Sequence, residues 1–310
     1  MTSPSILVKS VHTQYIAKKM LALITSYFNP ANCQKLKDNY VQFRKHLNHP
    51  IVTVELAFND QPFFINDAIH IRGTDKNLLW QKERLLNIAL ESLPNNVDKV
   101  AWLDADIIFE NSNWFQETEK KLDTFKVVQP FEYVSEDGHY SDPAYENTPS
   151  FGKFIAENPD HSQWLEASPW PSVGLIWSAR RDVLSNGFYD KDVVGSSDTY
   201  QLLSWLGLWN QQMVQLLPPH NRKEYLLWAW QSYEAVKGDI GSVSGNITHL
   251  YHGKKFSRQY FDRIRILVEN EFCASKDITL DSQRLYQWNS NKPLFHQSVK
   301  QYFVSRSQND

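Results

Sequence analysis

The sequence predicts an α/β fold with a mixed, mainly parallel sheet flanked by helices. Strand-like and helix-like segments alternate over the first 130 residues, as they do where parallel strands are joined by crossover helices. The strand-like segments are short apolar runs that end in polar or turn-forming residues, whereas the helix-like segments repeat their apolar positions at helical spacing. With 310 residues, 42% of them hydrophobic, the chain is long enough to bury one large core.

The first half of the chain supplies most of the expected sheet. Strands are expected over residues 21–26, 51–58, 99–109 and 126–129, and helices over 32–47, 78–93 and 114–124. Pro30 ends the first strand in an Asn-Pro turn, because the residue before a proline disfavours helix. The second strand is a β-branched, apolar run typical of a strand buried on both faces. Pro94 stops the second helix.

The second half begins with a long segment, 131–170, that is rich in Asp, Glu, Pro, Ser and His. Loops of this length in a compact domain are usually functional. Further strands are expected over 171–178 and 246–251, and helices over 199–217, 222–236 and 257–269. We expect one domain over 1–265, divided into two halves, 1–130 and 131–265. A helical C-terminal extension, 266–310, would pack on it.

Composition excludes some functions. The net charge of −3 gives no field that would draw the protein to nucleic acid or to an anionic membrane. No run approaches the roughly 18 apolar residues of a membrane span, and the first 20 residues are mixed and polar. Cys33 and Cys273 lack metal-site or redox spacing, which indicates free thiols. We therefore expect a cytoplasmic enzyme. The 11 tryptophans suit either sugar-binding surfaces or the core.

Two carboxylates, Asp104 and Asp106, follow the apolar run 100–103. This places them at the carboxyl end of a buried strand, where open α/β sheets bind ligands. On a regular strand they would point to opposite sides, so either one binds a divalent cation and the other a ribose, or a kink lets both share the ion. Capping of the strand end is the structural alternative. Apolar flanks on both sides favour a cation, because buried negative charges need an offsetting charge.

Residues 173–198 carry a specific family resemblance. The matching stretches are Val173-Gly174 with Trp177-Ser178-Ala179, then Asn186-Gly187-Phe188, and then Gly195-Ser196-Ser197-Asp198. Together with the Asp pair they resemble the GT-A glycosyltransferases, most closely the inverting β-1,4-galactosyltransferase group and family 2-like enzymes. Ser196 and Ser197 depart from that group's Gly-Gly-Glu-Asp pattern. The resemblance implies a Rossmann-like GT-A catalytic domain, with 1–130 as the nucleotide-binding half and 131–265 as the acceptor-binding half. It also implies Mn²⁺- or Mg²⁺-dependent transfer of a hexose-type sugar. UDP is the expected nucleotide, and polysaccharide biosynthesis is the expected context.

The same resemblance implies roles for individual residues. Asp198 would be the catalytic base that takes a proton from the acceptor hydroxyl, although an aspartate here also suits a helix N-cap. His249 or His252, with His252 preferred, would complete the metal site of Asp104 and Asp106. The donor-binding candidates, each able to serve a structural role instead, are Thr25, Tyr27, Asn29, Glu55, Arg84, Asn87, Lys254 and Arg258. The candidates for sugar and acceptor binding are Trp170, Gly174 and Trp177.

Two other functions remain open at this stage. A haloacid-dehalogenase-like phosphatase also places Asp-x-Asp at a strand end, but its Asp pair usually lies near the chain start. A catalytically inactive GT-A-like sugar-binding protein would be expected to have lost the carboxylates that this chain keeps. The favoured partners are a nucleotide-sugar donor and a carbohydrate acceptor, without nucleic acid or a transmembrane segment.

Overall fold

A seven-stranded sheet forms the centre of the molecule in the computed structural model, which describes residues 20–137, 147–158, 170–251, 253 and 262–307. Its strands lie in the order β10-β6-β9-β4-β1-β2-β3. Their bounds are β1 Met20–Phe28, β2 Ile51–Phe58, β3 Ile69–Gly73, β4 Val97–Leu103, β6 Val127–Gln129, β9 Ile176–Arg180 and β10 Ile240–Ser242. The strands β4, β1, β2 and β3 run parallel, and β9 is antiparallel to both neighbours. The predicted mixed, mainly parallel sheet is confirmed.

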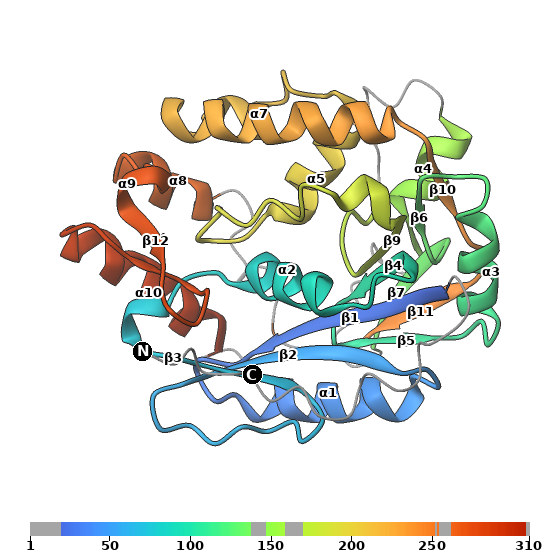
Figure 1. The fold of residues 1–310 in the computed structure, drawn as a ribbon, viewed down its shortest axis with the longest axis horizontal. Helices are drawn as coiled ribbons and strands as arrows, with labels where there is room; N and C mark the ends of the chain where they lie inside the picture. Colours follow the sequence, from blue (N-terminus) through green and yellow to red (C-terminus); the bar gives the residue numbers. More distant parts are fainter. Residues whose placement is uncertain (1–19, 138–146, 159–169, 252, 254–261, 308–310) are drawn as a thin grey trace.

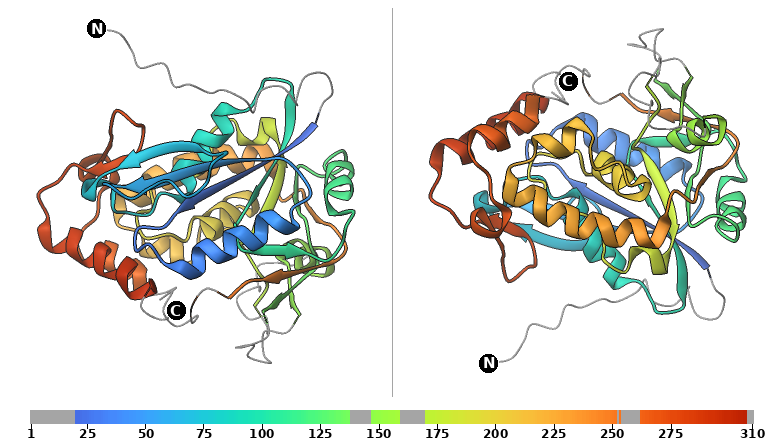
Figure 2. Two further views of the ribbon diagram at one scale, coloured as in Figure 1. Left: turned by 90° about the horizontal axis from the view of Figure 1, so that it is seen from below. Right: turned by 90° about the horizontal axis from the view of Figure 1, so that it is seen from above.

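Helices cover both faces of this sheet. Helix α1 (Gln34–His46) lies on one face, and α2 (Lys82–Ser92), α5 (Ser197–Leu206) and α7 (Pro219–Val236) lie on the other (Figures 1 and 2). The remaining helices are α3 Trp114–Lys121, α4 Phe151–Glu157, α6 Gln212–Leu216, α8 Asp262–Glu269, α9 Ala274–Asp277 and α10 Pro293–Ser307, with short 3-10 helices at Asp75–Asn77 and Arg181–Leu184. No helix of the described residues is both long and apolar enough to cross a membrane.

The core is divided by the sheet because successive side chains of a strand point to opposite faces. In β1, Ala22 and Ile24 join the apolar cluster beneath α2, α5 and α7, whereas Leu21 and Leu23 join the cluster beneath α1. All four are at most 1% exposed. Strand β2 is buried along its whole length, as its continuous apolar run predicts.

A second sheet changes the interpretation of the carboxylate strand. The expected strand 99–109 is two strands: β4 ends at Leu103, a turn carries Asp104 and Asp106, and β5 (Ile107–Phe109) enters a four-stranded sheet. That sheet has the order β5-β11-β7-β8, with β11 at Asn246–His249, β7 at Tyr133–Glu136 and β8 at Thr148–Pro149. The turn therefore joins two sheets, and the chain is kinked between the two carboxylates.

The C-terminal segment surrounds a third apolar cluster. Helices α8 to α10 and the hairpin of β12 (Ile278–Leu280) and β13 (Tyr286–Trp288) share this cluster with Leu79, Val193 and Val194. Those three residues precede α2 and α5. The segment after residue 262 thus packs on the same two chain regions that lead into these helices, as the left side of Figure 1 shows.

Candidate active site

A cleft of about 270 Å³ opens at the carboxyl ends of β1 and β4. Parallel strands end there together, since Thr25 of β1 pairs with Leu103 of β4. The cleft combines both signs of charge with imidazole and aromatic groups. Its ionisable side chains include Lys82, Glu83, Asp104, Asp106, Asp198, His249 and Arg263. This is the sheet edge at which the sequence predicted ligand binding.

Backbone hydrogen bonds fix the turn of the two aspartates. The amide of Asp104 donates to the carbonyl of Leu175 at 2.7 Å, and the carbonyl of Asp106 accepts from the amide of Leu250 at 2.8 Å. The second bond brings the end of β11 beside the turn. As a result, Nε2 of His249 lies 3.6 Å from Oδ2 of Asp106. The structure thus brings together one aspartate of the pair and one of the two predicted histidines.

Lys82 occupies the space between the other carboxylates. Its Nζ lies 2.6 Å from Oδ1 of Asp104 and 3.3 Å from both carboxylate oxygens of Asp198. Burial alone would lower the pKa of Lys82, but the negative charges of Asp104 and Asp198 raise it above its ordinary value. Burial raises the pKa of Asp104 to about 6, against the lowering effect of Lys82. The ammonium group therefore links the aspartate turn to α5.

Sequence reasoning missed Lys82, although a signal was present. Lys82 is the first residue of α2, where the partial positive charge of the helix N-terminus disfavours a cation. A lysine at such a position indicates a nearby anion that outweighs the helix dipole. Here two carboxylates provide that negative charge.

Asp198 faces the cleft from the first turn of α5. The N-cap of this helix is Ser196, so the alternative in which Asp198 is the N-cap is wrong. Asp198 packs against Gly174, where an added Cβ would lie 3.1 Å from Oδ2 of Asp198. The absence of a side chain at Gly174 therefore leaves room for the carboxylate. Gly174 as an acceptor-binding residue stays a prediction.

Aromatic side chains form one wall of the cleft. Trp80 stacks on Phe303 of α10 with ring centroids 6.3 Å apart, and Phe28 contacts Trp80 edge-to-face. The indole Nε1 of Trp80 donates to the carboxylate of Glu83 at 2.8 Å. Burial raises the pKa of Glu83 to about 8, so that its protonated form is favoured at neutral pH.

The cleft supplies some of the ligands that a divalent cation needs. Asp106 and His249 offer oxygen and nitrogen ligands side by side, and Nδ1 of His249 lies 4.0 Å from Oε1 of Glu136. Within the described residues, no group of three His, Cys, Asp or Glu side chains is arranged to hold a metal ion. A cation at this place would need further ligands from a bound molecule, such as diphosphate oxygens. The predicted residues His252, Lys254 and Arg258 lie outside the described part of the chain.

Two predicted donor contacts are corrected by the structure. Glu55 is 2% exposed, and its carboxylate oxygens accept the amides of Phe64 and Ile65 at 2.7 and 2.9 Å. Thr25 is fully buried, and its hydroxyl donates to the carbonyl of Leu103 at 2.7 Å. Neither residue lines the cleft, because both side chains satisfy backbone groups inside the sheet region.

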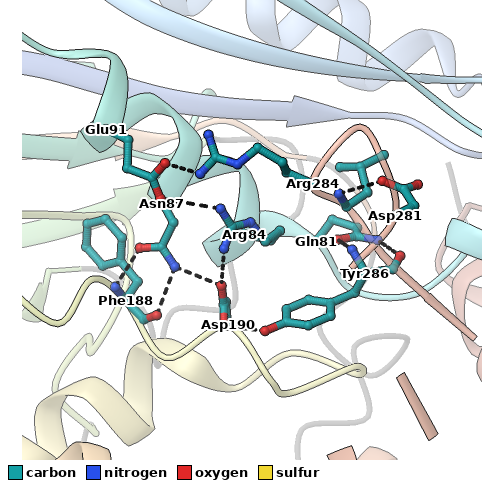
Figure 3. A network of polar contacts seen from close by, with 10 residues as sticks. Gln81, Arg84, Asn87, Glu91, Phe188, Asp190, Asp281, Arg284 and Tyr286 are labelled. Carbon is teal, nitrogen blue, oxygen red and sulfur yellow. Dashed lines mark hydrogen bonds and ion pairs between the residues drawn. The ribbon is translucent and has the colours of Figure 1, made fainter. Parts of the chain in front are cut away.

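Arg84 and Asn87 also lie away from the cleft. They line a second cavity of about 590 Å³ and hold the Asn-Gly-Phe loop against α2 (Figure 3). Asn87 donates to the carbonyl of Phe188 and accepts its amide, and Arg84 pairs with Asp190 at 3.0 Å. Helix α2 does line the cleft, but through Lys82 and Glu83 rather than through Arg84 and Asn87.

The remaining predicted residues divide between cleft, surface and core. Tyr27 and Asn29 line the cleft, as expected of residues at the end of β1. Trp170 is 45% exposed. Trp177 is 2% exposed, packs edge-to-face against Trp205 and donates to the carbonyl of Val173, so it is a core residue and no sugar platform.

No family model and no curated protein sequence matches the chain. Solved structures match it over most of its length. TarS from S. aureus is 11% identical, with 93% of this chain and 71% of that chain covered and a TM-score of 0.42. A Pyrobaculum calidifontis mannosyltransferase in complex with GDP-Man and Mn²⁺ is 12% identical, with 94% and 74% covered and a TM-score of 0.42.

The matches also include a member of the group that the sequence resembles. The catalytic domain of Drosophila β1,4-galactosyltransferase 7, in complex with xylobiose, is 12% identical, with 89% of this chain and 96% of that chain covered and a TM-score of 0.39.

Proposed function

We propose that this protein is a metal-dependent GT-A-type glycosyltransferase that moves a sugar from a nucleotide-sugar donor to an acceptor hydroxyl with inversion. The observation that supports it most directly is the meeting of Asp106 and His249 at 3.6 Å, at the carboxyl edge of a mainly parallel sheet. Asp198 faces the same cleft from across Lys82. A cation-binding pair opposite a carboxylate is the arrangement that such a transfer requires.

Each group has a role in the proposed reaction. Asp106 and His249 would hold a Mn²⁺ or Mg²⁺ ion, which when bound neutralises charge on the leaving diphosphate. Asp198 accepts the proton of the acceptor hydroxyl as that oxygen bonds to the anomeric carbon. The bond from the anomeric carbon to the diphosphate breaks on the opposite face, and its electron pair leaves with the diphosphate. Lys82 offsets the negative charges of Asp104 and Asp198 before substrate binds.

The finer features of this proposal come from the sequence. The resemblance of residues 173–198 to the β-1,4-galactosyltransferase group favours a UDP-hexose donor and a glycan acceptor. The net charge of −3 favours a neutral acceptor over nucleic acid. Two cysteines without metal-site or redox spacing favour a cytoplasmic protein.

The test is nucleotide release from a panel of nucleotide sugars with Mn²⁺ and candidate acceptors. We expect Asp198→Asn to lower kcat by a factor of about 10² to 10⁴ while UDP binding with Mn²⁺ is retained. Asp106→Asn should weaken that Mn²⁺-dependent binding. Asp67→Asn is the matched control, because Asp67 pairs with Arg44 on the surface outside the cleft.

Three results would contradict the proposal. Full activity of Asp198→Asn would exclude it as the base. Release of inorganic phosphate that depends on Asp104 would indicate a phosphatase. Sugar binding without nucleotide release from any donor would indicate an inactive sugar-binding protein.

A further inference from the structure

The turn that precedes the proposed base has an unusual backbone. Gly195 has φ of +93° and Ser196 has φ of +92°, both in the left-handed region. Glycine adopts this region freely, whereas a residue with a Cβ adopts it rarely and at a cost. Ser196 stands where the galactosyltransferase pattern has a second glycine. Something in the surrounding structure must therefore hold Ser196 in place.

A hydrogen-bonded chain from the C-terminal segment reaches this serine. Nε of Arg263 in α8 donates to the hydroxyl of Ser196 at 3.0 Å, and Nη1 of Arg263 contacts the hydroxyl of Tyr302 in α10 at 3.2 Å. All three residues are at most 8% exposed. Bonds to a buried guanidinium are among the stronger hydrogen bonds of proteins. A glycine at position 196 could not accept this bond.

Close packing limits the turn from the other side as well. A Cβ built on Gly195 would lie 3.2 Å from Nη1 of Arg263 and 3.3 Å from the ring of Trp80. The chain therefore passes directly against the guanidinium. Arg263 both contacts Gly195 and binds Ser196.

The turn determines where α5 begins. The carbonyl of Ser196 accepts the amides of Thr199 and Tyr200 at 3.0 and 3.2 Å, which are the first bonds of this helix. Asp198 lies between Ser196 and Thr199 in sequence and faces the cleft. Any rotation of Ser196 would change the direction of the first turn and so the position of the Asp198 carboxylate.

We propose that Arg263 and Tyr302 are positioning residues for Asp198, acting through the left-handed turn at Ser196. Tyr302 does not line the cleft, and it reaches Ser196 through Arg263. The role of Asp198 as base rests on the proposed function, whereas the effect of the C-terminal segment on the turn is independent of it.

The experiment compares Tyr302→Phe in two backgrounds. In the wild-type background we expect about a tenfold fall in kcat, with the dissociation constant for UDP and Mn²⁺ unchanged. In a Ser196→Gly background the turn is free of strain and has no hydroxyl for Arg263 to bind, so Tyr302→Phe should have little further effect. Tyr40→Phe is the matched control, because Tyr40 is buried and its hydroxyl bonds Thr53 outside the cleft.

Hydrogen exchange supplies a readout that needs no activity. The amides of Thr199 and Tyr200 should exchange about tenfold faster in Tyr302→Phe than in Tyr40→Phe. Arg263→Lys, which retains the charge but not the two-sided hydrogen bonding, should give the same increase. An equal loss of kcat from Tyr302→Phe in both backgrounds, or unchanged exchange at both amides, would overturn the proposal. If the wild-type protein transfers no sugar, the proposed function fails while the exchange result still decides the role of Tyr302.

Discussion

Replacing Lys82 by methionine removes the ammonium that lies between Asp104 and Asp198 and retains a side chain of similar length. At an effective dielectric of about 20, unit charges 2.6 Å apart, as in the pair of Lys82 and Asp104, attract by about 6 kcal/mol. Desolvation offsets much of this, and removing one partner of a buried pair costs about 3–5 kcal/mol. Because the Asp104 side chain is 27% exposed, we expect a loss of about 2–4 kcal/mol in the free energy of unfolding.

Urea denaturation at pH 7, with and without Mn²⁺, measures this effect. Mn²⁺ should stabilise Lys82→Met more than the wild type. Loss of the ammonium leaves the negative charge of Asp104 without its partner beside the proposed site of Asp106 and His249, which strengthens cation binding there, and a ligand that binds the folded state stabilises it. Lys99→Met is the control, since Lys99 pairs with Asp123, whose side chain is 70% exposed, and such a pair contributes about 1 kcal/mol or less. Equal losses in the two variants, or an equal response to Mn²⁺ in Lys82→Met and wild type, would refute the electrostatic role of Lys82.

Three further substitutions separate structural from catalytic residues. Glu55→Gln should lower stability by about 1–3 kcal/mol in urea denaturation, because Gln leaves one loop amide without an acceptor, while the KM for donor stays unchanged. Asn87→Ala should lower the free energy of unfolding by about 2–3 kcal/mol, because it loses the hydrogen bonds to the loop at Phe188, and the KM for donor should again stay unchanged. A tenfold or larger rise in that KM would place Asn87 in the donor site. Burial raises the pKa of Asp192 to about 7. The folded protein therefore keeps a proton that the unfolded chain releases above pH 4, and the stability of the wild type falls as the pH rises from 4 to 7. Asp192→Asn lacks this loss and should therefore gain about 3 kcal/mol relative to wild type between pH 5 and pH 8; a pH-independent difference in urea denaturation would contradict this.

Local patterns predicted the sheet well. Strand β2 spans the residues expected, because an apolar run buried on both faces leaves few alternatives. Helix boundaries were predicted less accurately. The expected helix 199–217 is interrupted at Gly207, which takes φ of +70° and ends α5. Helix α2 begins at Lys82 rather than at residue 78, because Thr74 caps a separate 3-10 turn.

The candidate site was predictable where residue type and spacing indicate metal binding. The aspartate turn was expected beside His249 or His252, with His252 preferred, and the structure places Asp106 beside His249. His252 lies outside the described residues. Glu55 was misassigned because a carboxylate in a buried strand looks functional until the loop amides that bind it are known. The contact of Arg263 with Ser196 joins segments far apart in the chain, and no local pattern indicates it.

The aspartate turn is one of several segments that connect the two sheets, since β6 also leads to β7 and β10 leads to β11. Asp104 follows the last residue of a strand in the seven-stranded sheet, and Asp106 precedes the first residue of a strand in the four-stranded sheet. A molecule bound to both carboxylates would therefore contact the end of a strand of one sheet and the start of a strand of the other.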